Sequence, residues 1–154
     1  MSMTPALFLE LRVAAKAKQT CDIVEALYEA GQKVALYTAD TGTANKLNLL
    51  LWSWKQETFI PHVVYEHGLA LFDPVILFGG TAPPPLPERV LLMYDPLPLD
   101  RLEGYARVID FAEVYHEQKR QEGRQRYKAM RDSGRFDLQF MTLGAFLARE
   151  NARR

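Results

Sequence analysis

The segment of residues 119–135 carries the side chains most able to do chemistry, because cations are concentrated there. Seven cations stand against two acids, which gives the segment a net charge of +5. The whole chain has 19 basic and 19 acidic residues, so the remainder carries −5. A neutral protein with one cationic strip is predicted to bind a local anionic partner rather than to coat nucleic acid with its whole surface. The cations are Lys119, Arg120, Arg124, Arg126, Lys128, Arg131 and Arg135, and the acids are Glu122 and Asp132.

Five side chains in and just before this segment recur at helical spacing. At about 100° per residue, positions three or four residues apart share one helix face. Neighbouring like charges on a helix repel by roughly 0.2–0.5 kcal/mol per pair, so the row lowers the stability of its own helix. A solvated face is one interpretation, and the ligands that would use such a row are a phosphate backbone or an acidic peptide. The row consists of His116, Arg120, Arg124, Lys128 and Arg131.

Aromatic residues favour the peptide over the phosphate backbone. Tyr127 lies on the same predicted helix as the cations, whereas Trp52 and Trp54 lie at the end of an earlier one. Residues two apart do not share a helix face, so at least one tryptophan is predicted at the surface. An exposed indole near a basic row would suit a peptide that ends in apolar and acidic groups.

Motifs for nucleotides, metals and nucleophiles do not occur in the sequence. There is no G-x-G-x-x-G after the first predicted strand and no G-x-x-x-x-G-K-[ST], so no nucleotide cofactor is expected. The three histidines lack a paired spacing, Cys21 is the single cysteine, and no G-x-S-x-G occurs. His62, which follows Pro61, is interpreted as a hydrogen-bonded structural histidine. We therefore expect no metal, no cofactor and no catalytic residue.

Two carboxylates leave an enzymatic alternative open. Asp95 and Asp110 lie at the ends of predicted strands, where α/β enzymes often place catalytic groups. Capping or turn roles explain these residues equally well. The alternative hypotheses are thus a small α/β enzyme with an unrecognised site, and a domain whose cationic helix binds single-stranded nucleic acid directly.

Five apolar runs of strand length alternate with helical patterns. Helices are predicted around residues 23–28, from Asp40 or Thr41 to Trp54, and over 115–133, with Gly31 and Gly134 ending the first and the third. Residues 136–154 are predicted to begin extended and to finish as a short helix. The alternation predicts a three-layer α/β domain with a mainly parallel sheet. The strand-like runs are residues 6–11, 33–37, 75–78, 89–94 and 107–111.

Length and composition favour one domain. With 48% hydrophobic and 25% charged residues, residues 1–154 are expected to form a single domain with its own core. No apolar run approaches the ~20 residues of a membrane span. Residues 1–11 have no cationic region before an apolar one, as a secretory signal would, and a single cysteine forms no intrachain disulfide. We expect a cytoplasmic protein that contacts no membrane.

Three segments of the chain resemble the chi subunit family of bacterial DNA polymerase III. Their order and spacing match the family from about residue 6 to residue 134, so residues 135–154 form a C-terminal extension beyond the resemblance. The segments are Leu51-Trp52 followed by Phe59-Ile60-Pro61-His62, then Val108-Ile109-Asp110-Phe111, then Gly123-Arg124-Gln125-Arg126-Tyr127-Lys128 with Arg131 and Gly134.

The resemblance implies a non-catalytic accessory subunit of a DNA-directed DNA polymerase complex, with a Rossmann-like fold and no nucleotide site. Such a subunit grips the acidic C-terminal tail of single-stranded-DNA-binding protein, whose last residues are aspartates followed by Ile-Pro-Phe. It meets DNA only indirectly in this way. Through a separate surface it binds the psi subunit, which joins it to the clamp loader.

The resemblance also implies roles for particular residues. Trp52 and Tyr127 match the apolar pocket for the tail, and Phe59 matches a position on the second partner surface. One extra residue before Arg124 leaves either Ala112 or Val114 as the adjoining pocket wall. The cations that match those meeting the tail carboxylates are Arg120, Arg124 and Lys128.

Overall fold

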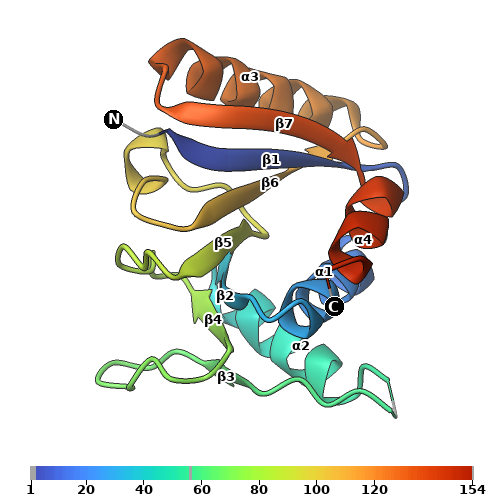
Figure 1. Cartoon of the computed structure of the whole chain (residues 1–154), viewed down its shortest axis with the longest axis vertical. Helices are drawn as coiled ribbons and strands as arrows, with labels where there is room; N and C mark the ends of the chain where they lie inside the picture. Colours follow the sequence, from blue (N-terminus) through green and yellow to red (C-terminus); the bar gives the residue numbers. More distant parts are fainter. Residues whose placement is uncertain (1–2, 56, 154) are drawn as a thin grey trace.

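Seven parallel strands form one sheet in the computed structural model, which describes residues 3–55 and 57–153. The strand order is β3-β4-β2-β5-β6-β1-β7, so β3 and β7 lie at opposite edges and β1 lies between β6 and β7 (Figure 1). Every pairing between neighbours is parallel. The strands are β1 (Thr4–Leu11), β2 (Lys33–Thr38), β3 (His62–Val64), β4 (Val75–Gly79), β5 (Arg89–Met93), β6 (Arg107–Glu113) and β7 (Phe136–Thr142).

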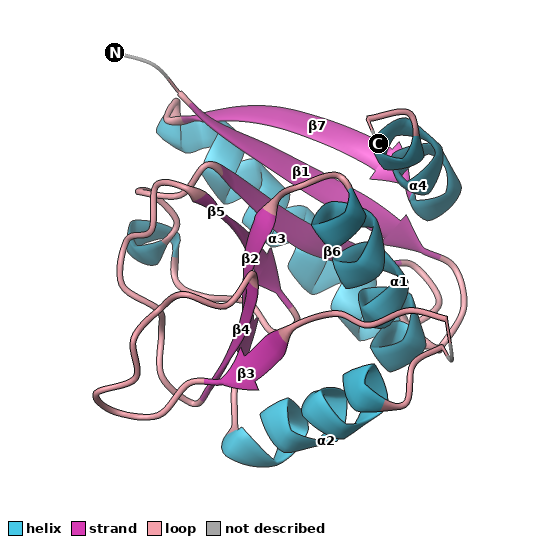
Figure 2. Ribbon diagram, turned by 60° about the horizontal axis from the view of Figure 1, so that its bottom comes forward, coloured by secondary structure: helices cyan, strands magenta, loops and turns pink. Residues whose placement is uncertain are grey.

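Helices cover both faces of this sheet (Figures 1 and 2). α1 (Lys16–Glu29), α2 (Thr41–Trp52) and α4 (Leu143–Asn151) share one face, where Leu27, Leu47 and Phe146 join the same buried cluster. α3 (Glu117–Ser133) packs on the other face through Met130, beside the loop that carries the short 3-10 helix η1 (Leu99–Arg101). The sequence-based prediction of a three-layer α/β fold with a parallel sheet is therefore confirmed.

α3 crosses over β1, because it connects β6 to β7 and β1 lies between those two strands. The ring nitrogen Nδ1 of His116 caps the start of the helix by accepting a hydrogen bond from the Lys119 N–H at 3.2 Å. Gly134 ends it with a φ of 69°, a left-handed conformation that glycine adopts at little cost. This crossover sets the cationic residues of α3 above the β1 and β7 side of the sheet.

Other elements follow the sequence pattern with small differences. Asp40 caps α2, and its carboxylate accepts from the Thr43 N–H at 2.6 Å. α2 ends at Trp52 rather than at Trp54, which packs against the core from outside the helix. β3 is not predicted from the sequence, because a three-residue edge strand has too few positions to show periodicity. The extended start and helical end expected of the tail are confirmed as β7 and α4.

Within residues 3–55 and 57–153, no helix combines the length and the apolar character needed to cross a membrane.

Candidate functional site

A groove of about 570 Å³ runs between α3 and the β1–β7 side of the sheet. We call it the cationic groove. Its floor and one end are formed by strand residues and the residue after β6, namely Phe8, Glu10, Ala112, Val114 and Phe140. Its wall is formed by one face of α3, namely Arg120, Gly123, Arg124, Tyr127, Lys128 and Arg131.

The floor of the cationic groove is aromatic at its middle. Phe8 on β1 lies opposite Asp110 on β6 and Phe140 on β7 in the strand register. The Tyr127 ring from α3 meets the Phe8 ring edge to face, with centroids 5.1 Å apart and planes inclined by 69°. Phe8 is buried, whereas 52% of Phe140 is exposed. An apolar ligand group placed here would contact aromatic surface from both α3 and β7.

The rim of the groove is positively charged. Four cations line it against one acid, Glu10, which is itself paired with Arg12. Arg120 forms an exposed ion pair with Glu117 at 2.9 Å. Arg124 and Lys128 form no ion pair with any residue that the structure describes, so their charges remain available to a ligand. The rim therefore has the charge and the hydrogen-bond donors to bind carboxylates.

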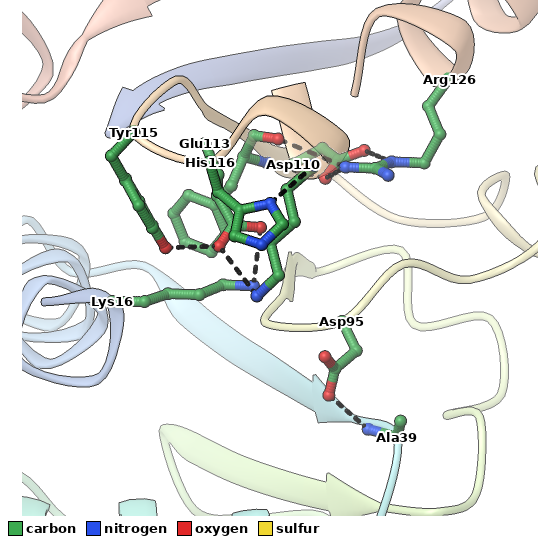
Figure 3. A network of polar contacts seen from close by, with 10 residues as sticks. Lys16, Ala39, Asp95, Asp110, Glu113, Tyr115, His116 and Arg126 are labelled. Carbon is green, nitrogen blue, oxygen red and sulfur yellow. Dashed lines mark hydrogen bonds and ion pairs between the residues drawn. The ribbon is translucent and has the colours of Figure 1, made fainter. Parts of the chain in front are cut away.

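The opposite face of α3 is fixed to the sheet by a buried ion pair. The Arg126 guanidinium donates to both oxygens of Asp110, at 2.8 and 3.1 Å, and also to the Phe111 carbonyl at 3.3 Å (Figure 3). Burial lowers the pKa of Arg126, but the Asp110 hydrogen bonds and charge outweigh it and raise that pKa. Because Arg126 faces the sheet, Arg124 and Lys128 are turned toward the groove.

A second polar cluster fixes the beginning of α3. Glu113, at the end of β6, accepts from the Tyr115 hydroxyl at 2.6 Å and from the Lys16 ammonium at 3.3 Å (Figure 3). Lys119 lies 3.6 Å from the same carboxylate. Burial raises the pKa of Glu113, but the Tyr115 hydrogen bond and the two lysines outweigh it and lower that pKa. The start of α1 and the start of α3 are thereby joined at one carboxylate.

Asp95 and Asp110 both have structural partners. Asp110 lies inside β6 rather than at a strand end, and its carboxylate is occupied by Arg126. Asp95 accepts a hydrogen bond from the Ala39 N–H at 2.8 Å, which joins the ends of β2 and β5 (Figure 3). These contacts give both carboxylates structural roles. Their predicted place at strand ends, on which the enzymatic alternative rested, is therefore no longer an argument for catalysis.

Trp52 corrects one sequence-based expectation. We predict from sequence that it shares an apolar pocket with Tyr127, and the structure contradicts this. Trp52 ends α2, which contacts β2, β3 and β4, whereas α3 contacts β6 and β7 toward the other edge of the sheet. From β1 the chain passes through β2 to β3 at one edge of the sheet, whereas β6 leads through α3 to β7 at the other edge. Trp52 and Tyr127 therefore lie toward opposite edges of the sheet.

Trp52 instead belongs to a cluster that we call the aromatic patch, formed by the exposed Leu49, Trp52 and Phe59 together with the buried His62. The Trp52 ring centroid lies 5.9 Å from that of Phe59 and 4.6 Å from that of His62. Leu49, Trp52 and Phe59 are each more than half exposed. The expectation that one tryptophan lies at the surface is confirmed, since Trp54 packs against the core.

His62 has the structural role expected of it. Its Nδ1 atom lies 2.6 Å from the Ile60 carbonyl and its Nε2 atom lies 3.2 Å from the Asn48 carbonyl. The ring therefore joins β3 to α2 and contacts the indole of Trp52.

The sequence predicts most of the residues in the wall of the groove, but few of those in its floor. Arg120, Arg124, Tyr127 and Lys128 line it together, as their helical spacing predicts. Ala112 and Val114 both line it, so the two are not alternatives. Arg131 belongs to the cationic row that the helical spacing predicts and lines the groove as well. Phe8 and Phe140 are the residues that the sequence does not indicate, because their in-register position on neighbouring strands appears only in the folded sheet.

Comparisons with known proteins identify the family. Residues 3–136 match the family model described as DNA polymerase III chi subunit, HolC. The chain belongs to this family. The resemblance stated from the sequence is therefore confirmed, and the family is one of subunits of DNA polymerase III.

Two relatives carry the same description. The DNA polymerase III subunit chi of Escherichia coli is 26% identical over 130 residues, which cover 84% of this chain and 87% of that protein. The subunit chi of Pseudomonas aeruginosa is 34% identical over 80 residues, which cover 52% of this chain and 54% of that protein, so this match spans about half of either. Most of β7 and all of α4 lie beyond the family match, which ends at residue 136.

Proposed function

We propose that this chain is the accessory subunit that links the clamp loader of DNA polymerase III to single-stranded-DNA-binding protein, by gripping that protein's acidic C-terminal tail in the cationic groove. The observation that carries the proposal is the pairing of an aromatic floor with a row of cations on one wall. A tail of aspartates followed by Ile-Pro-Phe offers the complementary groups, with apolar side chains for the floor and carboxylates for the rim. The proposed site residues are Arg120, Arg124, Tyr127 and Lys128, and Trp52 is removed from the set.

The magnitudes favour a weak and reversible grip. Burying a phenylalanine side chain contributes ~1.5–3 kcal/mol. Charge-assisted hydrogen bonds from the rim add about 1–3 kcal/mol each before the side chains are ordered. After the cost of association, we expect a binding free energy of about −8 kcal/mol, which corresponds to a dissociation constant in the micromolar range. Because the rim is exposed, salt should weaken this binding.

A titration with a labelled peptide tests the proposal. We expect a fluorescein-labelled peptide that ends in aspartates and Ile-Pro-Phe to bind with micromolar affinity, measured by fluorescence anisotropy. The same peptide without its terminal phenylalanine should bind at least tenfold more weakly. Equal affinity for the two peptides would contradict a groove that reads the end of the tail.

Direct binding of single-stranded DNA is the second candidate, and the four rim cations are the observation in its favour. It predicts tight binding of a naked oligonucleotide with a steep dependence on salt. The zero net charge of the chain weighs against it. A gel shift with naked single-stranded DNA separates the two functions, since the tail-binding function predicts no stable complex.

We further propose that the aromatic patch is the surface for the psi subunit. Phe59 matches a position on the second partner surface of the family, and Trp52 lies beside it. Exposed aromatic side chains grouped with Leu49 have the character of a protein-binding hot spot. Trp52→Ala and Phe59→Ala should each prevent capture of the chain by immobilised psi subunit while leaving the affinity for the tail peptide unchanged. Loss of both activities would contradict two separate surfaces.

A further inference from the structure

The floor of the cationic groove has apolar surface at two levels along the strands. One level is formed by Ala112 on β6, beside Glu10 on β1, and Val114 continues the apolar surface two residues further along the chain. The other is formed by Phe8 and Phe140, with the Tyr127 ring above them. A single ligand side chain would fill one level and leave the other exposed.

The distance between the two levels is set by the strand register. Ala112 pairs with Glu10, and Phe140 pairs with Phe8, so the levels are two residues apart along β1. A two-residue step along a strand spans ~6.6–6.8 Å. In an extended peptide, side chains two residues apart also lie ~6.6–6.8 Å apart and point to the same side. A peptide lying along the strands can therefore fill both levels with alternate side chains.

We propose that the groove reads two apolar side chains of an acidic peptide, the last and the third-last, and that Phe140 is the specificity-determining residue for the third-last one. This inference rests on the proposed function and adds a sequence requirement to it. The terminal residue of the peptide and the residue two before it must both be apolar. The residue between them faces away from the floor.

Three observations support Phe140 in this role. It is 52% exposed although it is a large apolar side chain, so a ligand can still cover it. It lies in the groove, directly beside Phe8 in the β1–β7 register. The groove of about 570 Å³ falls within the range of ~300–1,000 Å³ that holds ligands of several chemical groups.

Phe140 is also the groove residue that lies outside the family match. Phe140 lies on β7, after residue 136, where the family match ends. The wall on α3 lies inside the match, whereas this side of the floor lies outside it. The recognition of the second apolar side chain therefore depends on a residue that the family match does not include.

A double-mutant cycle tests the proposal. The two proteins are wild type and Phe140→Ala, and the two labelled peptides end in Asp-Asp-Ile-Pro-Phe or in Asp-Asp-Ala-Pro-Phe. For the first peptide we expect Phe140→Ala to raise the dissociation constant about tenfold, equivalent to ~1.4 kcal/mol. For the second peptide the two proteins should bind with the same affinity, because the partner of Phe140 is already missing. Phe72→Ala is the matched control, since Phe72 is an exposed phenylalanine in the loop between β3 and β4.

The outcomes of the cycle distinguish failure of this inference from failure of the proposed function. If wild type binds the first peptide and Phe140→Ala binds it equally well, the second apolar position does not exist, while the proposed tail binding stands. If Phe140→Ala weakens both peptides by the same factor, Phe140 does not read the third-last residue, and the inference is again overturned. If wild type binds neither peptide, the proposed function itself fails and takes the inference with it.

Discussion

Arg124 and Lys128 lie on the rim of the cationic groove on either side of Tyr127 in sequence, and their guanidinium and ammonium groups are not neutralised by any described carboxylate. Helical periodicity predicted their shared face from the sequence, because it depends only on local geometry. The same reasoning predicted that one tryptophan is exposed. It could not predict at which edge of the sheet Trp52 lies, because that depends on the direction of each crossover between strands.

At the residue scale, we predict that Arg124→Ala weakens binding of the acidic tail peptide at least tenfold. A hydrogen bond to a charged group contributes about 1.5–3 kcal/mol, which corresponds to this factor or more. The measurement is fluorescence anisotropy, with the circular dichroism spectrum as a check on folding. Lys46→Ala is the control, because Lys46 is an exposed cation on α2, near the other edge of the sheet. Equal losses in the two variants would mean that only overall charge matters.

At the element scale, α3 is held by contacts on the side away from the groove. Arg126 and Asp110 pair across α3 and β6, and Glu113 joins the beginnings of α1 and α3. The sequence showed α3 itself and its cationic face, including its end at Gly134. It did not show that Arg126 faces inward, because a cation in a basic segment is expected at the surface unless its buried partner is known. The floor of the groove was missed for a similar reason, since strand register is a property of the folded sheet.

The ion pair beneath α3 gives a prediction about stability. Arg126→Met removes the cation and leaves Asp110, which is 3% exposed, without its partner. We expect the free energy of unfolding to fall by about 2–3 kcal/mol, somewhat less than for a fully buried pair because a quarter of the Arg126 side chain is exposed. Urea unfolding followed by circular dichroism measures this change. Lys128→Met is the matched control on the same helix and should change the free energy by less than about 0.5 kcal/mol; a similar loss in both would argue that α3 tolerates no substitution of this kind.

The carboxylate of Glu113 gives a prediction about pH. Its pKa in the folded protein is lowered below the value of about 4.3 expected in the unfolded chain, through the Tyr115 hydrogen bond and the two lysines. Its contribution to stability is therefore complete above that unfolded value and is lost as the pH falls through the folded value. We expect the free energy of unfolding of Glu113→Gln to fall less steeply than that of wild type as the pH is lowered from about 5. Urea titrations at several pH values measure this dependence. If the free energy of unfolding changes with pH in parallel for the two proteins, Glu113 does not contribute to the loss of stability in acid.

At the scale of the whole molecule, charge and architecture separate two surfaces. The cationic groove lies between α3 and β7, and the aromatic patch lies at the end of α2, toward the opposite edge of the sheet. The segment beyond the family match is joined to the rest by Glu150, whose buried carboxylate lies 2.6 Å from Arg107 and 3.2 Å from Gln32. The three-layer arrangement could be predicted from alternating strand and helix patterns. The separation of the cationic groove from the aromatic patch could not be predicted, because it arises from the order of the strands in the sheet.

These contacts lead us to propose that residues 1–154 behave as one domain. We predict a single cooperative unfolding transition in urea, because α4 and β7 share a core cluster and an ion pair with the β1–β6 part of the sheet. Tryptophan fluorescence reports on the end of α2, and far-ultraviolet circular dichroism reports on the whole chain. The two curves should coincide, and an earlier transition in only one of them would indicate a second unit.

Binding of the tail of single-stranded-DNA-binding protein in the cationic groove can be tested with the intact partner. The full chain is passed over immobilised single-stranded-DNA-binding protein, either complete or lacking its last few residues, at low salt. We expect retention on the complete protein and loss of retention on the shortened one. Equal retention on both would show that the chain binds elsewhere, and the groove would then have no part in the linkage.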